Sequence, residues 1–566
     1  MKFDKETVII LGTCVVILLA WPFISESMGW SKPAGDKNIT ATEKPVPEVP
    51  APAAAAPVKP AAPVIPVVPA VPSAPEKNYT LENDLLALQI SGNTGKINRI
   101  TFRKYQNNAQ DSDISIETLS PQGAIFNYIP GADIQQVKCS VHAGNADITI
   151  IRDFASVRGN FQLRQRIALD KNYLITSEYT FVNTGKTPAV IPAAVVSGGA
   201  MGQWHQLTGD KIRAVAYRMD YLTADGNFKD VDGDDDDEDF YLSSPPEVRW
   251  AGVSNKYFCL LLKSGKPFRL WQYRSFVNGS KKAPLIAAGA NLPAMTLAPG
   301  SQESLSFSAY AGPKITANLN NFAPDANKVM HLAWGPLNYL ARFLLWLLKS
   351  FYALCGSYGL SIILLTLLVR TVFYPITARG NESMKKMQKV QPKFKELREK
   401  YKDNPQLLNQ KMAELYREEG VNPFAGCLPI LLQIPIFFAL YAMLDNVVEL
   451  RHVSFLWCKN LAAADTVFRI PLFIDFPFIG SSIPVNPLVL AMTALMVIQQ
   501  RMTPMSVDPA QKKMMAMMPV IMLLFLYDLP SGLTLYWTVS NIFSIIQLWL
   551  QKRRGQPKAE STAAGK

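Results

Sequence analysis

Residues 363–377 read ILLTLLVRTVFYPIT, a run that is apolar enough to lie in a lipid bilayer except at Arg370. Thr366 precedes this arginine by one helical turn, so the two polar side chains fall on one face of a helix. A charge at the bilayer centre costs about 3 kcal/mol or more. Arg370 therefore either serves a function within the membrane or reaches the membrane surface.

The second alternative is snorkelling. Arg370 precedes Ile376, near the end of the apolar run, by about 9 Å along a helix. An arginine side chain can cover such a distance while its stem stays in the apolar layer. Depth alone does not choose between snorkelling and a functional charge.

Apolar residues are concentrated near the two ends of the 566-residue chain. A spanning helix needs roughly 17 to 25 mostly apolar residues. By this criterion we predict six spans, at residues 8–24, 356–376, 423–446, 487–502, 514–529 and 533–550. The turn DLPSG at 528–532 joins the last two spans as a helical hairpin.

The first span lies within residues 1–30 and follows Lys2 and Lys5. No convincing small-residue cleavage site follows it, which favours an uncleaved anchor over a signal peptide. Residues 31–76 are rich in proline and alanine, a composition that predicts an extended tether.

Residues 77–320 contain short runs in which apolar and polar residues alternate, separated by turns such as GNTG at 92–95. This period of two predicts an antiparallel β-sandwich. Cys139 and Cys259 either pair there or remain buried thiols, because two cysteines define no framework.

Nothing in the sequence indicates catalysis or a resident metal or cofactor. The acidic run at 230–239 could suggest a calcium-binding EF-hand loop, but its glycine is in the wrong position and Tyr241 stands where the bidentate glutamate would be. These departures favour a solvated loop. We find no nucleophile motif and no phosphate-binding glycine loop. The four histidines are scattered, without metal-ligand spacing: His142, His205, His331 and His452.

Residues 334–351 predict an amphipathic helix that either lies on the membrane surface or leads into the next span. Its expected apolar face consists of Leu337, Leu340, Leu344, Leu347 and Phe351.

Charge predicts the orientation of the spans. Residues 378–422 and the tail at 551–566 are rich in lysine and arginine, and the loop at 503–513 adds two lysines, whereas the loop at 447–486 is nearly balanced. The positive-inside rule therefore places both termini in the cytoplasm and the β domain outside.

Residues 378–422 predict a helical hairpin. Apolar residues recur at steps of three and four from Met384 to Tyr401, and Asn404 with Pro405 can cap and begin a second helix. Pro392 is a point where the first helix can kink. Such a basic hairpin could contact anionic lipid, RNA or an apolar nascent segment, or simply space two spans.

Polar residues occur on three predicted spans. Gln433 lies on the proline-rich third span and places a side-chain amide at membrane depth. This amide could simply form a hydrogen bond with a neighbouring helix. The second span contributes Thr366 and Arg370. The last span contributes a larger set: Thr534, Tyr536, Trp537, Ser540 and Asn541.

Three stretches together resemble the YidC family of membrane protein insertases, which includes the mitochondrial Oxa and chloroplast Alb relatives. They are NPFAGCLPILLQIPIFFALY at 422–441, the arginine-bearing span with its YP at 374–375, and PSGLTLYWTVSN at 530–541. The anchor followed by a large β domain resembles the Gram-negative bacterial form, so the resemblance extends over essentially the whole chain.

The resemblance implies a bacterial inner-membrane insertase and chaperone that needs no nucleotide hydrolysis. It implies six transmembrane helices, five of them forming the insertase core, and a periplasmic β-supersandwich. The expected partners are nascent inner-membrane proteins, the Sec translocon with its accessory subunits, the ribosome and membrane lipids, but not DNA. Whether Sec is required stays open.

The resemblance also implies a hydrophilic groove within the inner leaflet that carries a positive charge. The residues that match its lining are Arg370, Thr366, Gln433, Tyr536, Trp537, Ser540 and Asn541. Those expected to capture substrate or contact the ribosome are Lys385, Lys386, Lys389, Lys393, Arg553 and Arg554.

Two other functions fit parts of the sequence. A transporter or channel would also collect polar residues on several helices, although no repeated halves are visible. A membrane-anchored periplasmic carbohydrate-binding protein would need a pocket in the β domain.

Overall fold

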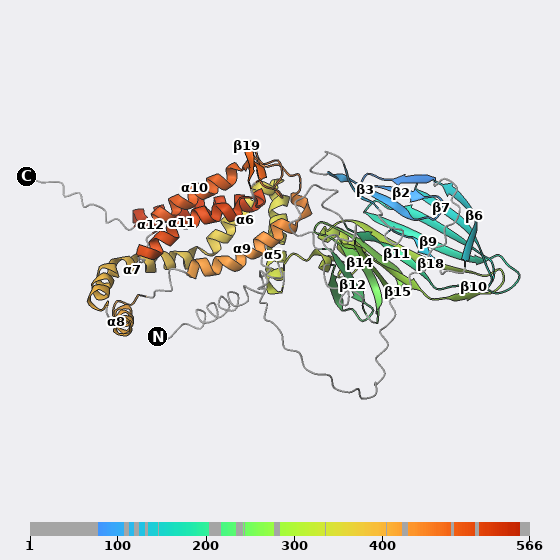
Figure 1. The fold of residues 1–566 in the computed structure, drawn as a ribbon, viewed down its shortest axis with the longest axis horizontal. Helices are drawn as coiled ribbons and strands as arrows, with labels where there is room; N and C mark the ends of the chain where they lie inside the picture. The colour runs from blue at the N-terminus through green and yellow to red at the C-terminus, as the bar shows by residue number, and fades with distance from the viewer. Residues whose placement is uncertain are drawn as a thin grey trace, which may run out of the picture. The chain divides into compact units, whose positions relative to one another are not determined.

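The computed structural model describes residues 77–106, 113–117, 124–130, 134–144, 146–202, 217–233, 242, 244–276, 284–333, 335–402, 404–421, 428–476, 480–503 and 509–554. The predicted anchor and tether lie outside these residues. The chain divides into two compact units. Among the described residues, a helical unit comprises Gly335–Tyr441 and the residues from Ala464 onward, and a β-rich unit comprises the residues up to 333 and Ala442–Ala463. Figure 1 shows the elements of both units.

The β-rich unit consists mainly of antiparallel strands. They are β1 (Asn78–Glu82), β2 (Leu86–Ser91), β3 (Ile97–Gln106), β4 (Asp113–Glu117), β5 (Tyr128–Ile129), β6 (Ile134–Ala143), β7 (Asp147–Ser156), β8 (Phe161–Leu169), β9 (Leu174–Asn183), β10 (Ala189–Ile191), β11 (Ala194–Met201), β12 (Arg218–Thr223), β13 (Phe228–Asp232), β14 (Glu247–Ser254), β15 (Phe258–Phe276), β16 (Pro284–Leu292), β17 (Met295–Leu297) and β18 (Gln302–Pro313).

The strands form one large sheet and two smaller ones. The large sheet follows the order β13-β12-β14-β15-β18-β9-β8-β7-β6, with β16, β11 and β5 attached beside this path. Strands β1 to β4 form a separate sheet in sequence order, and β10 pairs with β17. The predicted antiparallel β domain is therefore confirmed.

Alternation along the strands sets the core of this unit. On β8, Phe161, Leu163 and Ile167 are buried at alternate positions, as the period-2 pattern requires. Gln165 continues the same buried row, and its amide is satisfied by the carbonyls of Gly95 and Phe126 at 3.1 and 3.2 Å. A buried polar group is retained here because it has partners.

The structure decides two points that the sequence left open or misjudged. Cys139 and Cys259 are free thiols. The acidic run is not wholly a loop, because Asp230 and Asp232 lie in β13 and both pair with Arg218 of the neighbouring β12. Opposite charges on adjacent strands stabilise such a pairing. Residues 234–240 lie outside the described residues.

The chain leaves the sheets through two short helices, α4 (Thr316–Phe322) and η3 (Ala326–Met330). The remaining elements are α5 (Pro336–Cys355), α6 (Tyr358–Val372), α7 (Tyr374–Lys400), α8 (Pro405–Glu418), α9 (Leu428–Asn446), η5 (Val448–Leu450), β19 (Phe468–Phe476), β20 (Gly480–Val485), α10 (Pro487–Met502), α11 (Pro509–Leu526) and α12 (Ser531–Arg554).

The buried residues of helix α5 overlap only partly with the apolar face expected for membrane contact, and that membrane contact stays a prediction. Its buried residues are Ala341, Leu344, Leu345 and Leu348, on the side where it packs against α6. Of the five expected residues, only Leu344 is buried. The opposite face exposes Tyr339, Phe343 and Trp346. Leucines occupy so many adjacent positions that their spacing alone did not define the face.

The arginine-bearing helix α6 ends earlier than the expected span at 356–376. It stops at Val372, and α7 begins at Tyr374 after a bend of 58°. Pro375 lies in the first turn of α7, where its missing N–H is tolerated. The same missing N–H would break the hydrogen-bond ladder of a continuous helix.

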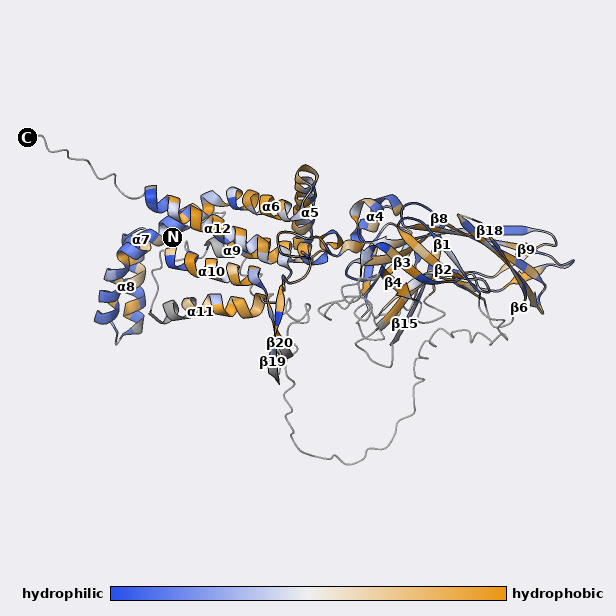
Figure 2. Ribbon diagram, turned by 90° about the horizontal axis from the view of Figure 1, so that it is seen from above, coloured by the Kyte–Doolittle hydropathy of each residue, from blue (hydrophilic) through white to orange (hydrophobic). Residues whose placement is uncertain are grey.

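The described helices vary in their capacity to cross a membrane. By length and composition α12 qualifies alone, and α6 with α7 qualifies only as a bent pair. Shorter apolar helices occur at Leu431–Asn446, Pro487–Met502 and Ala516–Leu526. Figure 2 shows hydrophobic residues along α9 and α11 and hydrophilic ones along α7 and α8. The count of six spans stays a prediction.

Helices α7 and α8 pack on a narrow apolar seam. Its buried residues are Met387, Val390, Leu415 and Val421, and the rings of Phe394 and Tyr416 lie 4.7 Å apart. The predicted cap is confirmed, since the Asn404 side chain accepts a hydrogen bond from the Leu407 N–H. Helix α7 continues through Pro392 as one helix.

Candidate functional site

Helix α12 is the centre of the candidate site because it packs against both α6 and α10. It also carries the polar residues singled out in the last predicted span. The buried ones include Thr534, Tyr536, Ser540 and Asn541. Such side chains are expensive to bury in an apolar bundle unless they have partners.

The first partner is Arg370 on α6. Its Nε donates to the Ser540 hydroxyl at 2.6 Å, and its Nη2 donates to the same oxygen. The half-buried guanidinium therefore turns toward α12. No carboxylate of the described residues pairs with it. Arg370 is thus a positive charge held by a neutral acceptor.

Thr366 lies one turn before Arg370 and is buried. Its hydroxyl donates to the Ile362 carbonyl of the same helix at 2.6 Å. This bond satisfies the hydroxyl within α6 and does not require a partner on another helix. Thr366 therefore shares a helix with Arg370, but its hydroxyl bond stays within α6.

The second partner of α12 is Gln433 on α9. Its Nε2 donates to the Tyr536 hydroxyl at 2.5 Å. Trp537, next along α12, lies with its ring centroid 4.8 Å from that of Phe437. Gln433 and Phe437 are one turn apart on α9, so the two contacts join α9 to α12 along adjacent turns.

The third partner is the backbone of α10, since the Asn541 amide donates to the Met492 carbonyl at 3.4 Å. The structure thus connects the predicted groove residues on α12 with three other helices. Arg370 and Ser540 meet directly, and Gln433 meets Tyr536. Thr366 and Trp537 lie on the same helices without joining these hydrogen bonds.

Four buried polar residues of α12 escaped the sequence analysis. They are Ser531, Thr538, Ser544 and Gln547. Ser544 donates to the Ser540 carbonyl at 2.9 Å, whereas the Gln547 Nε2 is buried and has no partner among the described residues. The spacing Tyr536, Ser540, Ser544, Gln547 continues one helical face and was the signal available.

The predicted capture residues on α7 differ in their surroundings. Lys393 pairs with Glu419 at 2.5 Å, and this carboxylate raises the pKa of Lys393. Lys386 pairs with Glu382 at 3.4 Å within the helix. Lys385 and Lys389 form no ion pair with the residues that the structure describes.

The basic end of α12 is described only in part. The Arg553 guanidinium lies 3.8 Å from the centroid of the Trp549 ring, a cation–π contact. Arg554 ends the helix, and its side chain lies outside the described residues.

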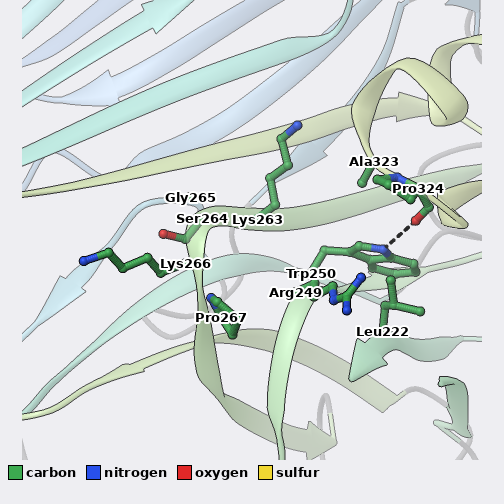
Figure 3. A pocket seen from close by; sticks show the side chains of 10 residues that line it. All are labelled: Leu222, Arg249, Trp250, Lys263, Ser264, Gly265, Lys266, Pro267, Ala323 and Pro324. Carbon is green, nitrogen blue, oxygen red and sulfur yellow. Dashed lines mark hydrogen bonds between the residues drawn. The ribbon is translucent and has the colours of Figure 1, made fainter. Parts of the chain in front are cut away.

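The β-rich unit contains a separate pocket of about 290 Å³ (Figure 3). Trp250 forms part of its wall, and the indole N–H donates to the Pro324 carbonyl at 3.1 Å. Arg249, Lys263 and Lys266 also line it. None of its ten lining residues is a carboxylate or a histidine. The pocket therefore lacks the paired carboxylates that glycoside chemistry uses.

Across the described residues, no group of three or more histidine, cysteine, aspartate or glutamate side chains is placed to hold a metal ion. The chemistry of the candidate site is instead that of one guanidinium with hydroxyl and amide groups. It can attract anionic or polar segments and donate hydrogen bonds to them.

Two family models match the chain. Residues 78–347 match the YidC periplasmic domain, and residues 350–558 match the 60Kd inner membrane protein family. A membrane protein insertase YidC of Geobacter metallireducens is 32% identical over 489 residues, which are 83% of this chain and 85% of the relative. One from Nitratidesulfovibrio vulgaris is 29% identical and covers 96% of this chain and 98% of the relative.

A solved structure, described as an active YidC insertase crystal structure with the first transmembrane domain resolved, also matches. It is 18% identical, covers 85% of this chain and 93% of its own, and has a TM-score of 0.36.

Proposed function

Since the chain belongs to the YidC family of membrane protein insertases, we propose that it inserts newly made inner-membrane proteins along a hydrophilic path beside α12. The chain is an insertase rather than an enzyme, and it acts on nascent membrane proteins. The path, its residues and the further partners belong to the proposal.

The observation that carries the proposal is the contact between Arg370 and Ser540. An arginine within a membrane bundle usually pairs with another charged residue or with backbone carbonyls. Here the acceptor is a neutral hydroxyl, and no acidic partner occurs among the described residues. The positive charge therefore remains available to an incoming segment.

The polar flank of a substrate is what needs such a path. A transmembrane segment partitions into lipid downhill, so that step requires no nucleotide. A charged flank at the bilayer centre costs about 3 kcal/mol or more. A half-depth polar path, reached from the cytoplasm, shortens this barrier, and Arg370 attracts an acidic flank.

The α7–α8 hairpin and the basic tail complete the proposal. The hairpin would contact the substrate or lipid headgroups through Lys385, Lys386, Lys389 and Lys393. The tail would contact the ribosome through Arg553 and Arg554. The proposal includes six spans, and the charge pattern supports an orientation with both termini in the cytoplasm and the β domain in the periplasm. We further propose that the chain acts either alone or with the Sec translocon.

The test replaces Arg370 in the full chain, reconstituted in vesicles. We expect Arg370→Ala to slow insertion of a single-span substrate with an acidic outer tail about fivefold or more. An attraction of about 1 kcal/mol in a wet site corresponds to that factor. Arg370→Lys should restore most of the rate because it restores the charge. Protease protection of the substrate tail measures insertion.

Arg501→Ala is the matched control, because Arg501 is an exposed arginine in the last turn of α10. It removes one positive charge and leaves the α6–α12 contact intact. A substrate with a neutral tail should respond weakly to both replacements. Normal insertion of the acidic-tailed substrate by Arg370→Ala would refute the electrostatic role.

A further inference from the structure

The segment between α9 and α10 contains a β-hairpin that the proposed function does not use. Strands β19 and β20 form a sheet of only two strands. Two-stranded hairpins are marginally stable in water unless another surface covers one face. The sequence predicted only a loop at 447–486, so this hairpin is a feature of the structure.

One face of the hairpin is apolar at its base. Phe468 pairs with Val485, and Ile470 pairs with Ile483. Residues directly opposite on paired strands project to the same side of the sheet. Phe468 is 57% exposed and Ile470 is 47% exposed, while Ile483 and Val485 are half-buried, so the β19 side of this face is largely uncovered by the described residues.

The other face is more polar. Arg469 is opposite Pro484, and Pro471 is opposite Ser482. Arg469 is exposed. At its base the hairpin is therefore amphipathic, with Phe468, Ile470, Ile483 and Val485 on one face and Arg469 and Ser482 on the other.

The base of the hairpin is fixed to the ends of two apolar helices. The Thr466 hydroxyl donates to Asn486 Oδ1 at 2.7 Å, and Asn486 is the residue before α10. The Asn486 amide in turn donates to the Tyr527 carbonyl at 2.7 Å, just after α11. The Tyr527 hydroxyl donates to the Pro484 carbonyl of β20.

These bonds place the apolar face at the level where α10 begins and α11 ends. If both helices span the bilayer, that level is the boundary between headgroups and acyl chains, where amphipathic elements bury their apolar side. We propose that the Phe468–Ile470–Ile483–Val485 face of the β19–β20 hairpin is seated in the outer leaflet of the bilayer. Lipid is the occupant because the adjoining ends of α10 and α11 also expose apolar side chains, namely Leu490, Leu524 and Phe525.

The seated hairpin would fix the outer ends of α10 and α11 against the membrane. Because α12 packs on α10 and begins just after α11, this anchor also holds the start of the candidate path. The inference rests on the proposed arrangement of spans, but it concerns a surface outside that path.

The test uses the full chain with its six cysteines replaced, reconstituted in phosphatidylethanolamine and phosphatidylglycerol vesicles. Single cysteines Ile470→Cys and Phe468→Cys report on the apolar face, and Ser482→Cys reports on the opposite face. Each is labelled with a bimane fluorophore. Nitroxide lipids labelled high on the acyl chain and aqueous iodide serve as the two quenchers.

We expect nitroxide lipids to quench the probes at 470 and 468, and iodide to quench them at least threefold less than the probe at 482. Equal iodide quenching at all three positions would overturn the proposal. Protection from iodide without nitroxide quenching would also overturn it, because a protein surface would then cover the face.

Insertion is measured with the same vesicles, so that two failures remain distinguishable. Active vesicles with an unquenched probe at 470 would refute the lipid seat alone. A labelled single-cysteine chain whose probe is quenched by nitroxide lipid but which cannot insert any substrate would count against the proposed function and leave the seat intact.

Discussion

Replacing Asp220 by asparagine tests how the β-rich unit holds the segment that leads to the helices. Asp220 lies in β12 and is fully buried. It accepts a hydrogen bond from the Ser254 hydroxyl at 2.6 Å and pairs with His331 Nε2 at 2.6 Å. His331 directly follows η3, and Lys314 directly follows β18. The cluster therefore connects the sheet to the exit of the chain.

The charges of this cluster depend on one another. Burial raises the pKa of Asp220, but His331, Lys314 and Ser254 outweigh it, and the pKa lies below its ordinary value. Burial lowers the pKa of Lys314, and Asp220 opposes that shift. Asparagine keeps the size of the side chain but removes its charge, which leaves Lys314 buried without its counter-charge.

The expected loss follows from that geometry. Removing one partner of a buried ion pair costs about 3–5 kcal/mol. For a domain of 150–250 residues each kcal/mol shifts Tm by about 2–4 °C, so we expect the β-rich unit to melt about 6–20 °C lower. Asp147→Asn is the matched control, because Asp147 pairs with the exposed Arg166 at the surface. Its melting temperature should match that of the unchanged chain.

The pH dependence has a defined sign. The folded-state pKa of Asp220 is lowered, so its stabilisation is fully present above the unfolded value of about 3.9. It is lost as the pH falls through the folded value. The difference in Tm between the unchanged chain and Asp220→Asn should therefore be constant near neutral pH and should become smaller below about pH 4.

The assay is thermal unfolding of the full chain in detergent, with hydrogen exchange followed in peptides from β12 and β14. Exchange in these peptides reports on the β-rich unit and not on the helices. A Tm within 2 °C of the unchanged chain, with exchange in β12 unaltered, would refute the reasoning. A gap that widens in acid would refute the assigned direction of the pKa shift.

Three further predictions concern the helical unit and its independence. Ser540→Ala removes the hydrogen-bond acceptor of Arg370. We expect it to slow insertion of an acidic-tailed substrate about two- to fivefold, a smaller effect than that of Arg370→Ala. An unchanged insertion rate in the vesicle assay would contradict this expectation. Asn404→Ala removes a helix cap worth about 1 kcal/mol and should speed amide exchange in α8 about fivefold, whereas Asn409→Ala, exposed in the same helix, should not. Deleting 81–311 should spare insertion, and complete loss of protease-protected substrate would argue against a path confined to the helices.

Local patterns account for the parts of the fold that the sequence predicts well. The alternation along β8 fixes which side chains enter the core, because strand side chains change face at every residue. The cap at Asn404 is equally local, since its acceptor reaches a backbone N–H three residues away. Neither feature depends on a distant segment.

The β19–β20 hairpin was not predicted, although the sequence contains a pattern that indicates strands. Phe468 and Ile470 begin a clear period-2 alternation in the apolar loop. Pro471 and Pro484 argue against central strands, which need every N–H for the ladder. Both prolines are tolerated in a two-stranded sheet, because each strand there is an edge strand.

Contacts between helices could not be predicted from spacing. Arg370 and Ser540 are 170 positions apart, and no local rule pairs an arginine with one of several hydroxyls on another helix. The face that α5 buries within the protein was not predicted for the same reason. Packing against α6 selects Ala341 and Leu348 from a helix in which leucines point in several directions.

The arrangement around α12 bears on whether Arg370 snorkels. A snorkelling arginine extends its guanidinium toward the nearer membrane surface, where water solvates the charge. Arg370 instead donates twice to Ser540, one turn along the same helix from Tyr536, which Gln433 holds from α9. The charge thus belongs to a polar row shared by three helices. A substrate segment that reached Arg370 would meet that row next, and this is why the proposed path follows α12 rather than the end of α6.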